Sequence, residues 1–406
     1  MRQNPKSKSS PESKTRSFPS EDSLSIYVHY PFCSKLCGYC DFHKSVLDRR
    51  REKIFLEALL IDTELAADEL RSAYKNRIPE ITTLYIGGGT PSLIDLKLFE
   101  KWIEIVRRRF KLSDNLEFTI ELNPESTTKE NLEVFRQAGV NRLSIGVQSF
   151  DSESLKLLDR RHRIIDTHRA VYLARAMGFE NYSVDLIFGL PGQTPAKLQD
   201  DLEELLELEP NHVSFYQLTV KEQTPLESKI KSGEIKLPDD DEMAIFYETG
   251  CQFLAEEGFE RYEISSFARK GKRSRHNQRY WESKPCLALG PSAHGFDGQK
   301  RYSLIADTGE YIETLTNDHR RPLIWDENTL QNRMTEHIML GLRTTAGIDR
   351  KVFNERFGRS DSELFDQDEF ARLVEIGYLI PSGGKLCLSD KGLNMADEIT
   401  HRLLAD

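Results

Sequence analysis

Three cysteines near the start of the chain form the pattern with the clearest chemical meaning. Cys33, Cys37 and Cys40 follow a short apolar run with the spacing C-x3-C-x2-C. Three thiolates at this spacing can bind three corners of a cubane iron–sulfur cluster, which leaves the fourth iron free for chemistry. A structural zinc site needs four ligands, and the sequence offers no second cysteine pair. The array therefore predicts a [4Fe–4S] cluster, with unrelated buried cysteines as the alternative.

The same array, with Tyr39 just before its last cysteine, resembles that of the radical S-adenosylmethionine (SAM) superfamily. In that superfamily the amino and carboxylate groups of SAM chelate the open iron. One electron from the reduced cluster then breaks a C–S bond and releases a 5′-deoxyadenosyl radical. The protein holds and orients the cofactor and keeps oxygen and water away. The resemblance implies SAM as a second cofactor and places Tyr39 at its site.

A glycine-rich segment and a carboxylate follow two later apolar runs. Gly88, Gly89 and Thr90 belong to the segment GGGTP, and glycines let a backbone approach a ligand closely. The segment matches the superfamily's motif for the SAM amino group, with a tight strand-to-helix turn as the alternative. Glu121 ends the third apolar run, where a carboxylate can accept hydrogen bonds from ribose hydroxyls. A salt-bridged surface glutamate is the alternative there.

Three further polar residues are candidates for the same site. Gln148 closes the fourth apolar run and can orient polar groups of a cofactor. Arg160 can pair with the SAM carboxylate as a bidentate fork. Asp185 lies within an otherwise apolar run, and a buried carboxylate needs a partner. Asp185 is therefore either a ligand-site residue or half of an internal ion pair.

A second distinctive segment, HNQRYW, contains His276, Tyr280 and Trp281. Imidazole is a common axial ligand of haem iron, and aromatic rings pack well on a flat macrocycle. These three residues are haem-binding candidates, and His294 is a second candidate for the iron ligand. For both histidines the alternative is a buried structural imidazole with satisfied hydrogen bonds.

Short β-type runs alternate with amphipathic helical patterns from Leu24 to about residue 217. Six βα repeats predict an α/β fold with a parallel sheet flanked by helices, most simply a partial (β/α)6 barrel. In such sheets the functional groups gather at the carboxyl ends of the strands. The predicted strands are Ser25–Tyr30, Thr83–Ile86, Glu117–Leu122, Arg142–Gly146, Tyr182–Phe188 and His212–Gln217. The predicted helices are Ile54–Leu70, Leu93–Phe110, Thr128–Gln137, Asp166–Met177 and Pro195–Leu206. Gly139 and Gly178 stand where two of these helices should stop.

The pattern changes toward the C-terminus. Helices over 336–343 and 368–376, a hairpin over 379–388 and a final helix over 390–404 predict a smaller α+β, winged-helix-like module. Its acidic surroundings favour packing or binding a protein partner over binding DNA. We expect a disordered polar tail over 1–23, the barrel over 24–225, an extension with the HNQRYW segment over 226–300, and the C-terminal domain over 301–406.

Composition sets further bounds. The chain has 406 residues and a net charge of −10, which argues against a nucleic-acid binder. An iron–sulfur cluster and six cysteines in a chain of this length predict a reducing, cytoplasmic location rather than a secreted disulfide framework. The N-terminal segment lacks the apolar core of a secretory signal. Its Glu12, Glu21 and Asp22 weigh against an organellar presequence.

The motifs together resemble one branch of the superfamily, formed by oxygen-independent coproporphyrinogen III oxidase and the haem chaperones of the HemW family. The match extends from about Ser25 to the C-terminal helix. By this resemblance the three cysteines hold the cluster. The SAM site is then lined by Tyr27, Gly88, Gly89, Thr90, Glu121, Gln148, Arg160 and Asp185. One departure is Asp159, where the family usually has glycine before the SAM-binding arginine.

Three features favour the chaperones over the oxidase. The oxidase has a further cysteine two residues after the third cluster cysteine, and Phe42 stands there instead. The oxidase also has an ordered N-terminal extension over its active site, whereas this chain has a short polar tail there. The HNxxYW segment is characteristic of the chaperones. The resemblance therefore implies a protein that binds a [4Fe–4S] cluster, SAM and haem and passes haem to other proteins. Oxidative decarboxylation of coproporphyrinogen is the alternative function, and another radical SAM reaction is a third.

The implied partners follow from this function. They are haem-requiring recipient proteins, among them proteins at the membrane surface, and a reductant protein such as a ferredoxin or flavodoxin. No coproporphyrinogen oxidase activity is expected. A dimer is the alternative to a monomer.

Overall fold

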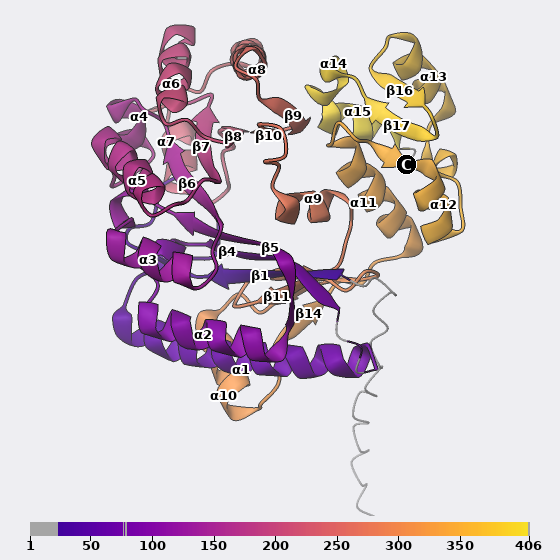
Figure 1. Cartoon of the computed structure of the whole chain (residues 1–406). Coiled ribbons are helices and arrows are strands. Elements are labelled where there is room, and N and C mark those ends of the chain that lie inside the picture. The colour runs from indigo at the N-terminus through magenta and orange to yellow at the C-terminus, as the bar shows by residue number, and fades with distance from the viewer. Residues whose placement is uncertain (1–22, 76, 78, 405–406) are drawn as a thin grey trace, which may run out of the picture.

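The computed structural model describes residues 23–75, 77 and 79–404, which form a large α/β body and a smaller C-terminal α+β module (Figure 1). The predicted disordered tail lies outside the described residues, except for Ser23, where the first strand begins. No helix in the described part of the chain is long and apolar enough to cross a membrane.

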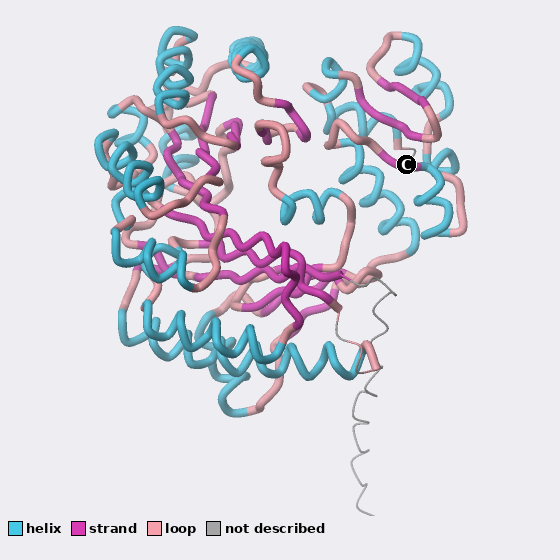
Figure 2. Tube along the Cα trace, viewed as in Figure 1, coloured by secondary structure: helices cyan, strands magenta, loops and turns pink. Residues whose placement is uncertain are grey.

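The six predicted strands all form, and they lie side by side in chain order and mutually parallel. They are β1 (Ser23–Tyr30), β4 (Glu80–Gly88), β5 (Lys111–Leu122), β6 (Arg142–Gln148), β7 (Tyr182–Phe188) and β8 (His212–Gln217). The connecting helices lie outside the curved sheet, as Figure 2 shows. These helices are α1 (Arg49–Ala73), α2 (Leu96–Arg109), α3 (Lys129–Gln137), α4 (Ser152–Leu157), α5 (Ile164–Ala176) and α6 (Pro195–Glu207). The predicted partial barrel is confirmed.

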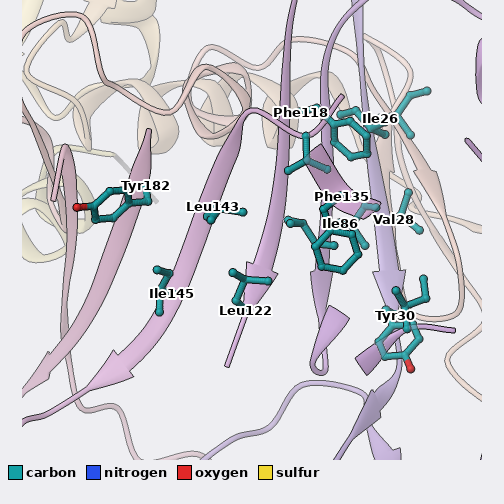
Figure 3. Close-up of a cluster of buried hydrophobic side chains, with 14 of the residues drawn as sticks. Ile26, Val28, Tyr30, Ile86, Phe118, Leu122, Phe135, Leu143, Ile145 and Tyr182 are labelled. Atoms are coloured by element: carbon teal, nitrogen blue, oxygen red, sulfur yellow. The ribbon is translucent and has the colours of Figure 1, made fainter. Parts of the chain in front are cut away.

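Alternation along the strands separates a dry outer layer from a polar interior. Ile26 and Val28 of β1 and Ile145 of β6 belong to the buried cluster between sheet and helices (Figure 3). Successive side chains of a strand point to opposite faces. Tyr27 and Ser144, which alternate with these apolar residues, therefore face the barrel interior.

Helix ends follow the sequence signals. The Thr128 side chain accepts a hydrogen bond from the backbone N–H of Asn131 and caps α3. Gly139 follows α3 with φ +94°, and Gly178 follows α5 with φ +78°. Glycine adopts a positive φ without a steric penalty, so both residues stop their helices as predicted.

Six further strands widen this sheet at both edges. β10 and β9 pair beyond β8, whereas β11 pairs in parallel with β1 and is followed by β12, β13 and β14. Their bounds are β9 (Glu260–Glu263), β10 (Ser266–Ala268), β11 (Cys286–Leu289), β12 (His294–Phe296), β13 (Arg301–Leu304) and β14 (Leu323–Trp325). The helices here are α7 (Pro225–Lys231), α8 (Asp240–Glu256), α9 (Arg275–Trp281) and α10 (Thr308–Asn317). The sheet thus continues past residue 301, where the sequence analysis placed a domain boundary.

The C-terminal module has its own apolar core. Its hairpin of β16 and β17 turns at Gly383 and Gly384, as predicted. The elements are α11 (Leu330–Leu342), β15 (Ile348–Asp349), α12 (Arg350–Phe357), α13 (Gln367–Glu375), β16 (Leu379–Ser382), β17 (Lys385–Leu388), α14 (Asp390–Leu393) and α15 (Ala396–Leu403). The predicted small α+β module is confirmed.

One helix of this module differs from expectation. The sequence pattern predicts a single helix over 390–404, but the structure breaks it into α14 and α15 at Asn394 and Met395. The Asn394 side chain accepts a hydrogen bond of 2.9 Å from Arg261 of β9. The break therefore coincides with a contact to a residue that is distant in the sequence, which the spacing of apolar residues in 390–404 could not predict.

A buried ion pair joins α1 to the far edge of the sheet. Asp62 and Arg321 are both fully buried at the side chain and lie 2.6 Å apart. Asp62 also accepts hydrogen bonds from the Tyr311 hydroxyl and from the backbone N–H of Gly290. Removing one partner leaves the other charge buried and unpaired.

We expect Asp62→Ala to lower the free energy of unfolding by about 3 kcal/mol. This is the lower end of the usual range, because Glu69 still contacts Arg321 at 3.2 Å. Urea denaturation followed by circular dichroism measures the effect. Asp68→Ala, at an exposed ion pair of the same helix, is the matched control and should cost about 0–1 kcal/mol. Equal losses in the two variants would contradict a structural role for the buried pair.

Candidate functional site

A cavity of about 400 Å³ opens at the carboxyl ends of the parallel strands. Its walls are supplied by strands β4 to β8 and by the segment that carries Cys33, Cys37 and Cys40, called the cysteine loop below. Of the predicted SAM-site residues, those on its wall are Tyr39, Gly88, Gly89, Thr90, Glu121, Gln148, Arg160 and Asp185. Tyr27 lines a neighbouring hollow instead. The fold therefore brings together side chains that are up to 146 positions apart in the sequence, from Tyr39 to Asp185.

The three cysteines lie in and beside the loop between the short strands β2 (Phe32–Cys33) and β3 (Ser45–Val46). All three carry free thiols and line the cavity. Burial raises the pKa of the Cys33 thiol to about 11 and also raises that of Cys37. Iron must displace these protons to bind, because the thiolate is the ligand.

The arrangement of these thiols suits a cluster. Within the described residues, no three His, Cys, Asp or Glu side chains are placed to hold a single ion together. In a cubane cluster each thiolate binds its own iron atom, so the ligands need not converge on one point. Cys33, Cys37 and Cys40 on one cavity wall fit that requirement.

The glycine segment packs β4 against the cysteine loop. A Cβ atom on Gly89 would lie 2.5 Å from the carbonyl oxygen of Phe32, and Gly88 has φ +110°. The backbone N–H groups of Gly89 and Thr90 donate to the carbonyls of Tyr30 and Phe32. The glycine segment is therefore both a tight turn and part of the cavity wall. Because side chains are excluded where it packs against the cysteine loop, its backbone is exposed to the cavity.

Glu121 accepts hydrogen bonds from the Tyr85 hydroxyl at 2.8 Å and from the backbone N–H of Gly88 at 3.1 Å. Burial raises the pKa of Glu121 to about 7, and the nearby Asp185 also raises it. The carboxyl is held by protein donors and faces the cavity, so a surface salt bridge does not describe it.

Asp185 is surrounded by hydroxyl groups. Ser144 and Ser183 donate to its carboxylate at 3.1 Å and 3.2 Å. Burial raises the pKa of Asp185, and these hydrogen bonds together with the Arg142 charge oppose that rise. Asp185 therefore sits as a hydrogen-bonded carboxylate on the cavity wall.

Arg160 is anchored but not saturated. One guanidinium nitrogen donates to Asn123 and to the Gly146 carbonyl at 2.9 Å and 2.7 Å, and another lies 3.8 Å from the Cys37 sulfur. Its buried Nε has no hydrogen-bond partner among the described residues. A buried donor without a partner is costly, and a ligand carboxylate would satisfy it.

The residue before Arg160 does not compete for it. Asp159 forms an ion pair with Lys35 at 2.9 Å, and Asp159 itself is not part of the cavity wall. Asp159 has φ +57°, a left-handed conformation that glycine adopts most readily and that aspartate tolerates better than most residues. Gln148 also has a positive φ, +71°, at a bulge that ends β6 and turns its side chain to the cavity wall.

The haem candidates of α9 do not share one face. His276 is buried, with Nδ1 2.8 Å from the Thr83 hydroxyl and Nε2 2.9 Å from the Tyr280 hydroxyl. Burial lowers the pKa of His276 to about 3, so its imidazole is neutral. Tyr280 borders the neighbouring hollow, whereas Trp281 faces the C-terminal module, where Arg343 lies over its ring. Iron ligation by His276 would require breaking one of its two hydrogen bonds.

The neighbouring hollow, with a volume of about 540 Å³, was not predicted from the sequence. It shares part of its wall with the cavity and is bordered by three histidines: His29, His43 and His294. The alternation of Tyr27 and His29 along β1 was the available signal, since both residues had to face the barrel interior.

Comparisons with known proteins agree with these features. Residues 27–205 match the radical SAM superfamily, and residues 328–394 match the HemN C-terminal domain. The chain is 34% identical to the haem chaperone HemW of Bacillus subtilis over 383 residues, which cover 94% of this chain and 99% of that protein. It is 35% identical to the mitochondrial radical S-adenosyl methionine domain-containing protein 1 of Danio rerio, over 92% of this chain and 84% of that one.

Among solved structures, coproporphyrinogen III oxidase (HemN) from Escherichia coli superposes with a TM-score of 0.80 at 24% identity. The superposition covers 94% of this chain and 90% of that chain. At this level of identity the likeness concerns the fold.

Proposed function

Because the chain belongs to the HemW family of radical SAM proteins, we propose that it binds a [4Fe–4S] cluster, SAM and haem and delivers haem to recipient proteins. The observation that carries the haem part is the pair of adjoining hollows. The cavity of the predicted SAM site shares Phe42, Gly88, Glu121 and other wall residues with a second hollow lined by imidazoles and aromatic rings. These are the side chains that suit an iron porphyrin.

The chain's own residues would divide the work at the first cavity. Cys33, Cys37 and Cys40 would hold the cluster, which, when reduced, supplies one electron to the SAM sulfonium. Arg160, with its unpartnered Nε, would pair with the SAM carboxylate. Glu121 would accept hydrogen bonds from the ribose hydroxyls.

The proposal extends to partners and location. The electron would come from a reductant protein such as a ferredoxin or flavodoxin, and the recipients would be haem-requiring proteins. The three cysteines must stay reduced to bind a cluster, which requires a reducing compartment, so we propose the cytoplasm.

The oxidase alternative is tested directly with its substrate. We expect the reduced, cluster-loaded protein with SAM to convert no coproporphyrinogen III to protoporphyrinogen, because Phe42 stands where the oxidase has its further cysteine. Chromatography of the oxidised porphyrins measures the product. The Escherichia coli oxidase, assayed in parallel, is the positive control. SAM-dependent accumulation of protoporphyrinogen would replace the chaperone proposal with the oxidase.

A further inference from the structure

We infer that haem binds in the second hollow with the His294 imidazole as an axial ligand of its iron. This inference rests on the proposed function and gives it a site. The hollow lies between β1, β12 and the cysteine loop, and its volume of about 540 Å³ falls in the range of cofactor pockets.

Of the three histidines that border the hollow, His29 is engaged at both ring nitrogens and His43 at one. His29 has Nδ1 3.2 Å from the Tyr27 hydroxyl and Nε2 2.8 Å from the His43 carbonyl oxygen. His43 has Nε2 3.0 Å from the Thr308 hydroxyl. His294 is exposed on β12, and none of the described residues forms a hydrogen bond or ion pair with its ring. Among the described residues, His294 can therefore bind iron through either nitrogen without breaking an internal contact, whereas His29 must break one and His43 has only Nδ1 available.

The rest of the wall suits the other parts of a haem. Phe42 is 64% exposed, and Phe296 and Tyr280 add two more aromatic rings to pack on a macrocycle. Arg301 and Lys221 supply cations for the propionate carboxylates. Each cation now pairs with a carboxylate, Arg301 with Glu336 and Lys221 with Asp41, in partly exposed ion pairs. Such pairs are weak and can exchange for a bound carboxylate.

The same geometry gives the HNxxYW segment a role without iron ligation. The Nε2 atom of His276 holds the hydroxyl of Tyr280, and Tyr280 borders the hollow. His276 is then a positioning residue: it lies outside the hollow and holds the Tyr280 ring in place on the wall. The hollow also shares Gly88 and Glu121 with the SAM cavity, so a porphyrin bound there would face the cofactor.

The test is an anaerobic titration of cluster-reconstituted protein with haem and, separately, with iron-free protoporphyrin IX. We expect His294→Ala to weaken haem binding about tenfold or more and to remove the imidazole-type visible spectrum, as loss of a metal ligand does. Added imidazole should restore that spectrum, and affinity for protoporphyrin IX should not change. Arg301→Gln should weaken binding of both porphyrins, because both carry propionates.

Two control variants make the outcomes distinct. His168→Ala, on the outer helix α5, should match the wild type. His276→Ala should weaken both porphyrins while leaving the iron coordination spectrum unchanged. An unaltered haem spectrum in His294→Ala would overturn this site, and loss of the spectrum in His276→Ala alone would transfer ligation to His276. If the wild-type protein binds no haem, the proposed function itself fails.

Discussion

Replacing Cys37 with serine is expected to abolish the iron–sulfur absorbance of the anaerobically reconstituted protein. Cys37 lies on the cavity wall between the other two array cysteines in sequence, and its sulfur contacts Arg160. Serine offers a hard, protonated hydroxyl, whereas iron–sulfur clusters select soft thiolates. With only two thiolates left, the cluster loses the corner that keeps it in place. Iron and sulfide analysis together with the visible spectrum measure the loss.

Cys387→Ser is the matched control for this change. Cys387 is a free cysteine on β17, in the C-terminal module and outside the cavity. The Cys387→Ser variant should keep the full iron content of the wild type. A full iron complement in Cys37→Ser would contradict the assignment of the array and, with it, the placement of SAM.

Replacing Glu121 with glutamine is expected to weaken SAM binding by roughly 10- to 100-fold at pH 8, since hydrogen bonds to a charged group contribute about 1.5–3 kcal/mol. Below pH 7 the difference should shrink. The pKa of Glu121 is raised to about 7, so the wild-type carboxyl is increasingly protonated as the pH falls. Its affinity for the cationic cofactor should then fall toward tenfold per pH unit. Isothermal titration calorimetry from pH 5.5 to 8.5 measures both effects.

The same carboxyl affects stability with a defined sign. Its folded-state pKa, about 7, lies above the ordinary value of 4.5, so the folded protein binds this proton more tightly. The stabilising contribution is present below pH 4.5 and is lost as the pH rises through 7. Glu121→Gln should therefore gain stability relative to wild type between pH 5 and pH 8. Glu153→Gln, at an exposed glutamate of α4, is the control and should change neither property. A pH-independent SAM affinity in the wild type would contradict a role for the Glu121 carboxylate.

The sequence was sufficient for features that depend on local pattern. Strands β7 and β8 end where the apolar runs end, and the alternation along β1 and β6 separates outer from inner residues. The cysteine array and the strand-end carboxylate Glu121 were recognisable because each has a local signature. Parallel strands then necessarily carry their end residues to one edge of the sheet.

What the sequence could not provide depends on distant contacts. His276 is satisfied by Thr83, which lies 193 positions earlier, and by Tyr280. The second hollow needs β12 beside the cysteine loop, which follows from the parallel pairing of β11 with β1 across 261 positions, as in Ser25 with Cys286. The spacing of residues along the chain does not predict such a pairing. Only the structure showed that His276 is hydrogen-bonded at both nitrogens, whereas the His294 ring has no such bond among the described residues.

The most direct measurement is the binding stoichiometry of haem with the wild-type, cluster-reconstituted protein under anaerobic conditions. We expect saturable binding of one haem per chain with a shifted Soret band, followed by loss of that band when an apo haem protein is added as acceptor. Haem that binds without saturation, or with the spectrum of free haem, would contradict the proposal that this chain carries haem.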